Sequence, residues 1–182
     1  VKGEEAPRIS AATLDEAKEP GSSVLPAWDR LCLMDMEAED ALEPMDASKF
    51  DAFIFGGILG NVIEREDGSY GSDDRTSELR RLNFMHRRHL GPMQMTTDTA
   101  VLVSRMVLEE GKFLCDIPTI DSPEIYATDA KKAKSEDVPE DSVCMEGFRY
   151  VVHRGSSGEW EPILPQGMKE LLLSSADDGI LG

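Results

Sequence analysis

The chain has 182 residues, enough for one domain with a substantial core, and its apolar share of 40% is ordinary for a globular protein. Its formal net charge of −17 opposes a surface that neutralises nucleic-acid phosphates and fits a cationic partner, although acidity can serve solubility alone. The scattered Cys32, Cys115 and Cys144 form no disulfide framework or zinc motif, and no apolar run of transmembrane length or signal peptide is visible, so we expect a reducing, cytoplasmic setting and no membrane.

The first half of the chain alternates polar segments with short apolar ones. Residues 1–30 are polar and read as a linker or the remnant of a truncated N-terminus, with a short helix over 11–18; the start at Val1 rather than Met suggests a missing upstream piece. From residue 31 to 182 we expect one domain. Its first predicted elements are a buried strand over 30–35, a loop or short helix over 36–48, the clearest strand over 50–59, a surface loop over 62–74 and a helix over 75–82.

Residues 88–100, RHLGPMQMTTDTA, are the most informative stretch. A short strand within residues 83–90 is followed by a Gly-Pro break and by an apolar helix over 99–110, which ends at Gly111. Thr96, Thr97 and Asp98 are all suitable N-caps for this helix. The pattern predicts a strand, an exposed loop and a helix N-terminus, which by itself suits a carboxylate or a phosphate.

The remaining elements close the fold. They are a strand or extended segment over 113–120, a break at 121–124, a charged segment over 128–142, hairpin strands over 148–153 and 160–164, and a helix over 166–173. Alternating strands and helices favour an α/β fold with parallel pairings, in which ligands bind at the carboxyl ends of strands. Three loops are expected there, at residues 35–37, 56–61 and 90–98.

Six phrases of the sequence together resemble one protein family. They are FDAFIFGGILG, DDRTSELRR, RRHLGPMQMTTDTAV, IDSPE, FRYV and EPILPQGM. Over about residues 31–173 the chain resembles SPOUT-class S-adenosyl-L-methionine-dependent methyltransferases, in a family once labelled as RNA methyltransferases, whose fungal members methylate an arginine of a small-subunit ribosomal protein. Residues 1–30 do not resemble the strand and helix that begin this family's fold, so the first elements are absent or the chain is a fragment.

The resemblance implies a mostly parallel sheet flanked by helices, with a C-terminal deep trefoil knot. It also implies an S-adenosyl-L-methionine cofactor bent in the knot and touched by residues 34–37, 56–60 and 90–97, and it implies a monomer. The cofactor-binding residues on these loops are then Asp35, Phe55, Gly56, Gly57, Gly60, Leu90, Gly91, Gln94, Met95, Thr96 and Thr97. The alternative is that the glycines only make turns and the methionines are core.

Methyl transfer from a sulfonium to nitrogen is an in-line displacement that needs alignment and exclusion of water but no metal. An arginine acceptor is permanently charged, so a carboxylate must orient one nitrogen and ease the loss of its proton. We rank Asp98 and Glu124 first as catalytic carboxylates and assign Arg75 and Asp121 to the substrate, with the cofactor's carboxylate as the alternative partner of Arg75. Alternatives remain open, because Asp98 and Asp121 can act as caps and Arg75 can pair with a neighbouring aspartate.

A cluster of basic residues bears on the choice of substrate. It comprises Arg75, Arg80, Arg81, Arg87 and Arg88, with His86 and His89 nearby. The two histidines lack a third ligand, and at this net charge the arginines read as a solvated face or as anchors to an acidic loop rather than as an RNA contact. The family resemblance, together with the acid surplus, implies as the leading hypothesis a protein arginine N-methyltransferase acting on a basic ribosomal protein. The others are an rRNA or tRNA methyltransferase and a non-catalytic module for cofactor binding or protein interaction.

Overall fold

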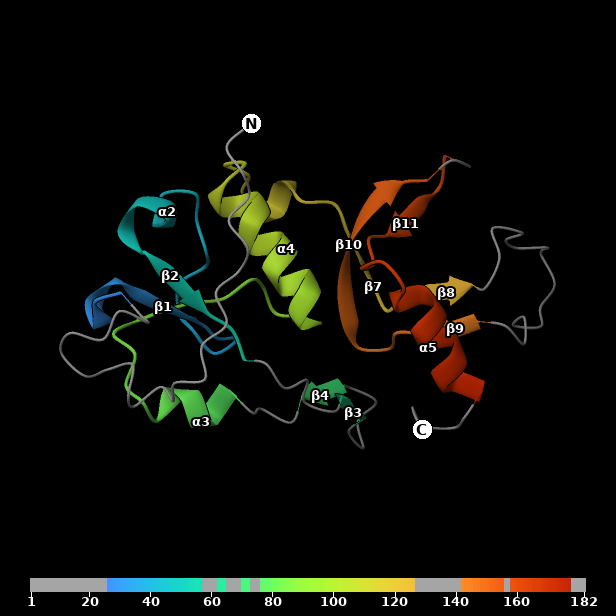
Figure 1. Cartoon of the computed structure of the whole chain (residues 1–182), viewed down its shortest axis with the longest axis horizontal. Coiled ribbons are helices and arrows are strands. Elements are labelled where there is room, and N and C mark those ends of the chain that lie inside the picture. Colours follow the sequence, from blue (N-terminus) through green and yellow to red (C-terminus); the bar gives the residue numbers. More distant parts are fainter. Residues whose placement is uncertain are drawn as a thin grey trace.

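The computed structural model describes residues 26–56, 62–64, 70–72, 76–126, 142–155 and 158–177. The strands are β1 (Leu31–Met34), β2 (Ala52–Ile54), β3 (Val62–Glu64), β4 (Tyr70–Ser72), β5 (His86–Arg88), β6 (Gln94–Met95), β7 (Thr119–Asp121), β8 (Glu124–Tyr126), β9 (Ser142–Cys144), β10 (Phe148–Arg154) and β11 (Trp160–Pro162). The α-helices are α2 (Asp46–Lys49), α3 (Thr76–Arg80), α4 (Thr97–Leu108) and α5 (Met168–Asp177), and the 3₁₀ helices are η1 (Trp28–Arg30) and η2 (Leu114–Asp116). Helix α4 lies between the sheet around β1 and the long strand β10 (Figure 1).

A parallel sheet in the order β2-β1-β5 forms the first layer. The central strand β1 is buried along its whole length, as expected for a strand covered on both faces, and the predictions of strands within residues 30–35 and 83–90 are confirmed. The predicted strand over 50–59 is much shorter. It pairs only at Ala52–Ile54, because its partner β1 offers just Leu31–Leu33 in register. Residues 57–60 lie outside the described part of the chain.

The second sheet is mixed and is organised around β10. This strand runs parallel to β6 and antiparallel to β7 and β11, and the predicted hairpin of β10 and β11 is confirmed. The prediction that residues 94 and 95 are loop was wrong, because they pair with Phe148 and Arg149. A two-residue strand has no periodicity of its own, and its partner lies more than fifty residues along the chain. The fold is a mixed α/β fold with a parallel sheet.

Two short antiparallel hairpins complete the described strands. The surface loop predicted over 62–74 is wrong in part, since β3 pairs with β4 from Val62 opposite Ser72 to Glu64 opposite Tyr70. The β-branched pair Val62-Ile63 and the aromatic Tyr70 favour strands, although glycine, serine and acidic residues surround them. The second hairpin pairs β8 with β9 across the charged segment 128–141, which lies outside the described residues, as does the helix predicted over 11–18.

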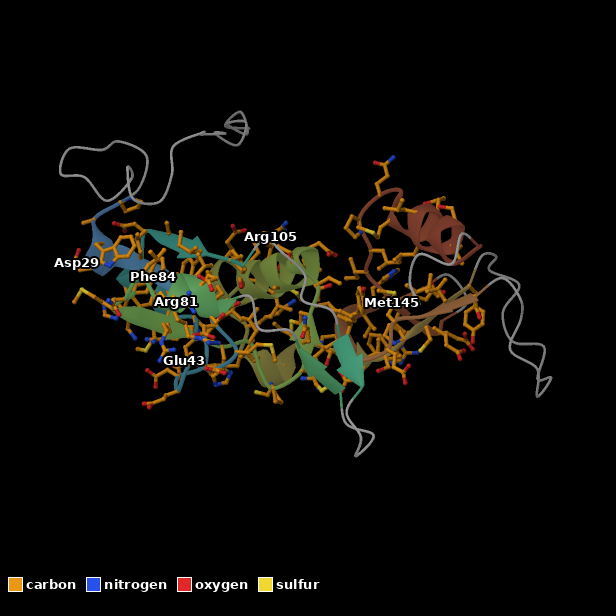
Figure 2. All side chains as sticks on the ribbon, turned by 90° about the horizontal axis from the view of Figure 1, so that it is seen from below. Asp29, Glu43, Arg81, Phe84, Arg105 and Met145 are labelled. Carbon is orange, nitrogen blue, oxygen red and sulfur yellow. The ribbon has the colours of Figure 1, made fainter. Side chains whose placement is uncertain are left out.

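The core is built on the two faces of β1. Cys32 and Met34 face a cluster that includes Val103 and Val107, four residues apart on α4. Leu31 and Leu33 face the opposite cluster, where Phe84 stacks on Trp28 with ring centroids 4.6 Å apart. Figure 2 shows Phe84 with Asp29 at one end of the molecule and Met145 toward the other. Trp28, which precedes β1, thus belongs to this packed cluster.

Helix α4 begins two residues earlier than its sequence predicts. Thr96 occupies the N-cap position, while Thr97 and Asp98 are the first helical residues. Gly111 has φ +70° beyond the C-terminus, as the predicted terminal glycine requires. The extended segment predicted over 113–120 is interrupted by η2 and becomes regular only in β7. None of the helices in the described ranges is long and apolar enough to cross a membrane.

Candidate functional site

Three loops leave the carboxyl edge of the parallel sheet. They follow β1 at Asp35, β2 at Phe55 and β5 at His89, and parallel strands bring such ends to one edge. The first and third loops are joined by backbone hydrogen bonds: the Leu42 N–H donates to the His89 carbonyl at 2.9 Å, and the His89 N–H donates to the Asp40 carbonyl at 2.9 Å. Pairing in the sheet therefore places together loops that are far apart in the sequence.

The second and third loops meet near the start of α4. The Thr97 hydroxyl donates a long hydrogen bond of 3.5 Å to the Gly56 carbonyl. A Cβ at Gly56 would lie 3.2 Å from the Thr76 hydroxyl oxygen, so the absence of a side chain lets α3 approach this loop. Gly91 has φ +115°, which only glycine adopts without strain, and its N–H donates to His89 Nδ1 at 3.0 Å. Of the predicted residues, Gly57, Gly60 and Arg75 lie outside the described ranges.

The carboxylate of Asp35 is fully buried and accepts hydrogen bonds from other groups of the protein. Its Oδ2 accepts from Arg80 Nε at 2.9 Å and from Arg87 Nη1 at 3.0 Å, and its Oδ1 accepts from the Glu37 N–H at 3.0 Å. These bonds close the first loop and tie it to α3 and β5. The interpretation of Arg80 and Arg87 as anchors to an acidic loop is confirmed.

A second buried carboxylate, Asp46 on α2, lies beneath the same edge. It is 1% exposed and accepts from Arg88 Nε at 2.9 Å and from the Glu43 N–H at 3.0 Å. Burial raises the pKa of Asp46, but its bonds to Arg88, Glu43 and Lys49 outweigh burial and leave this pKa below its ordinary value. Arg88, also predicted to be an anchor, thus holds the end of β5 against α2.

Polar side chains also order the start of α4. The Thr96 hydroxyl is buried and donates to the Thr99 hydroxyl at 2.9 Å. Burial raises the pKa of Tyr150 to about 12, a hydrogen bond with Thr96 opposes that shift, and the charge of Asp98 adds to it. The Thr96 hydroxyl therefore serves the helix start, whereas Asp98 is half-buried in the first turn, next to Thr97, whose hydroxyl reaches the second loop.

An apolar pocket with a volume of about 230 Å³ lies against the third loop. The described residues that line it are Leu90, Gly91, Pro92, Met95, Val103, Leu114, Cys115, Ile117, Thr119 and Arg149. Leu90, Gly91 and Met95 were predicted from the sequence, whereas the wall from η2, β7 and β10 was not. The one feature of the sequence that could have pointed to Arg149 is a charged residue within the predicted strand at FRYV.

The predicted acids fall in different places. Asp121 on β7 accepts from Arg149 Nε at 2.6 Å and Nη2 at 2.9 Å, and these bonds hold the pKa of Asp121 below its ordinary value. Glu124 on β8 is exposed and accepts from the Tyr126 hydroxyl. Figure 1 shows β8 and β9 beside α5, away from the parallel sheet. Gln94 and Phe55 are half-buried, on β6 and just after β2.

Comparison with known proteins gives a consistent relationship. The profile of the family described as "Protein arginine N-methyltransferase SFM1-like" matches residues 10–179. The chain is 39% identical over 145 residues to protein arginine N-methyltransferase SFM1 of Saccharomyces cerevisiae, covering 79% of this chain and 57% of that protein.

Two solved structures of the yeast arginine methyltransferase SFM1 are also similar. The complex with SAM shares 34% identity with a TM-score of 0.63, over 84% of this chain and 60% of that one. The complex with MTA shares 37% identity with a TM-score of 0.58, over 79% and 60%. The chain thus spans somewhat less than two thirds of these relatives. Since the family profile matches most of its length, the chain belongs to the SFM1-like family.

Proposed function

We propose that the chain is an S-adenosyl-L-methionine-dependent protein arginine N-methyltransferase. The observation that carries this proposal is the meeting of three loops at the edge of the parallel sheet beside an apolar pocket. Membership in a family described by arginine methylation, and a relative solved with SAM, support the same reading. When bound, the cofactor supplies an electrophilic methyl group on a sulfonium.

The walls of the pocket suit an adenosyl group. A flat, largely apolar ring system packs well against Leu90, Met95 and Val103. In this proposal, backbone N–H and C=O groups of the third loop form hydrogen bonds with the polar atoms along the edge of the ring. Because the Asp35 carboxylate is already bonded to two arginines, residue 35 contributes through its backbone and by fixing the loop. Phe55, Gly56, Gln94 and Thr97, together with Gly57 and Gly60, remain proposed cofactor contacts.

Asp98 is the preferred carboxylate for the acceptor arginine. It lies in the first turn of α4 next to Thr97, whose hydroxyl reaches the second loop. In the proposed reaction its carboxylate holds one guanidinium nitrogen and takes that nitrogen's proton as the new N–C bond forms and the methyl group's bond to sulfur breaks, which leaves a neutral thioether. Glu124 is the less favoured candidate, because it pairs with Tyr126 on a separate hairpin. Arg75 remains a proposed substrate contact, whereas both carboxylate oxygens of Asp121 are bonded to Arg149.

A basic protein substrate fits the charges around the first loop. Glu37, Glu39, Asp40 and Glu43 are exposed there, within a chain of net charge −17. Arg80, Arg87 and Arg88 are bonded to the buried carboxylates of Asp35 and Asp46, which disfavours their use as phosphate contacts and hence the RNA alternative. We propose a small-subunit ribosomal protein as the substrate, in the cytoplasm.

A finer assignment of fold accompanies this function. We propose a SPOUT-type arrangement with a trefoil knot in a monomeric protein. The parallel order β2-β1-β5, with ligand loops gathered at one edge, supports the class. A crystal structure that traces the chain through residues 57–61 tests the knot, and light scattering tests the monomer.

A methyl-transfer assay tests the activity. Purified chain and methyl-labelled cofactor are incubated with separated small-subunit ribosomal proteins and, in parallel, with rRNA and tRNA. Label on an arginine of a basic ribosomal protein supports the proposal. Label on RNA alone refutes the protein substrate, and cofactor binding without transfer to either class leaves a non-catalytic module.

A further inference from the structure

Arg149 gives the apolar pocket a charged end. Among the described residues that line the pocket, Arg149 alone carries a full charge, and its side chain is 25% exposed at the rim. The guanidinium is permanently protonated, and its ion pair with Asp121 occupies Nε and Nη2, which leaves Nη1 outside that pair. A ligand that packs an apolar body against Leu90 and Val103 would therefore bind best with an anionic group at this end.

The guanidinium is held in one orientation. Asp121 accepts from Nε at 2.6 Å and from Nη2 at 2.9 Å, which is a bidentate pair along one edge of the fork. The remaining nitrogen, Nη1, lies on the side of the third loop, 3.7 Å from the position that a Cβ of Gly91 would occupy. Nη1 therefore lies beside the third loop at Gly91, and Asp121 fixes that direction.

We infer that Arg149 binds the carboxylate of the cofactor's amino-acid end and so distinguishes the complete cofactor from nucleosides that lack this group. The inference rests on the proposed function. The adenosyl group lies against the apolar wall, and the carboxylate accepts a charge-assisted hydrogen bond from Nη1. Asp121 is then a positioning residue that presents the fork.

Two ligands that differ by the carboxylate-bearing arm test the inference. S-adenosylhomocysteine carries the arm, and 5′-methylthioadenosine has the same adenosyl thioether without it. Calorimetric titration of the whole chain with each ligand gives two affinities for every variant. We expect Arg149→Gln to weaken S-adenosylhomocysteine binding about tenfold or more, equivalent to about 1.4 kcal/mol, and to change methylthioadenosine binding less than about twofold. Arg149→Lys keeps the charge without the fork and should restore part of the loss.

Arg154→Gln is the matched control. Arg154 lies on the same strand, β10, and its guanidinium stacks on Trp160 outside the pocket, so its neutralisation should leave both affinities unchanged. Equal weakening of both ligands by Arg149→Gln, or no weakening of either, overturns the inference while the adenosyl site stands. Failure of the unaltered chain to bind either ligand overturns the proposed cofactor site and this inference with it.

Discussion

Replacement of Asp46 by alanine tests the buried ion pair beneath the candidate site. The variant leaves Arg88, whose side chain is 13% exposed, without its main partner and removes the acceptor of the Glu43 N–H. Breaking a buried pair by removing one partner costs about 3–5 kcal/mol. Because Arg88 Nη1 keeps the Arg87 carbonyl at 2.8 Å and Asp40 at 3.4 Å, we expect a loss near the lower end, about 3 kcal/mol.

Urea denaturation measures this loss as a lower unfolding midpoint. Asp51→Ala is the matched control, because Asp51 pairs with Arg30 at the surface, where the two side chains are 49% and 40% exposed, and such pairs contribute below about 1 kcal/mol. A destabilisation by Asp46→Ala no larger than that by Asp51→Ala would refute the argument that the buried pair stabilises this edge.

The pH dependence gives a second readout for the same pair. The pKa of Asp46 is lowered in the folded state, so its stabilising effect is complete above the ordinary carboxyl pKa of about 4. That effect is lost as the pH falls through the lowered folded-state value. The stability difference between the unaltered chain and Asp46→Asn should therefore shrink in acid, and a constant difference from pH 7 to pH 3 would contradict the assignment.

Three further outcomes follow from the site. Asp98→Asn should lower kcat about 100-fold with unchanged S-adenosylhomocysteine affinity, whereas Glu124→Gln should change kcat less than about threefold; equal losses would contradict the preference for Asp98. Gly91→Ala should destabilise the fold by about 1–3 kcal/mol because of its φ of +115°, and an unchanged urea midpoint would show that the turn tolerates a side chain. A thiol reagent followed by peptide mapping should label the exposed Cys115 of the native chain, and more slowly when S-adenosylhomocysteine is present. The same reagent should spare Cys32, because this thiol is buried and its pKa is raised to about 12. Labelling of Cys32 in the native chain would contradict this packing.

Features with a local physical cause were predictable from the sequence. Each of three elements is indicated by residues close together in the sequence: β1 by its apolar run, α4 by its three-and-four spacing, and the hairpin of β10 and β11 by the turn residues between its strands. All three are present in the structure. Gly111 is predictable for the same reason, since a positive φ after a helix favours glycine. The polar loops after parallel strands could be named because strand direction alone puts their ends together.

Features made by distant partners were not predictable in detail. Arg80, Arg87 and Arg88 reach Asp35 and Asp46 across 45, 52 and 42 residues, and a run of arginines has the same composition whether it binds RNA or buried acids. Residues 94 and 95 become a strand only because Phe148 and Arg149 arrive beside them.

The order of residues is enough to predict an α/β chain with strong acidity and three polar loops after strands, and to show a resemblance to one family, because these properties are local or additive along the chain. Only the folded structure shows which charged side chains form ion pairs in the interior and which remain at the surface. It also places Arg149 in the wall of the pocket that Leu90 and Gly91 line. The physical reason is that burial and charge pairing depend on neighbours in space, which the order of residues does not state.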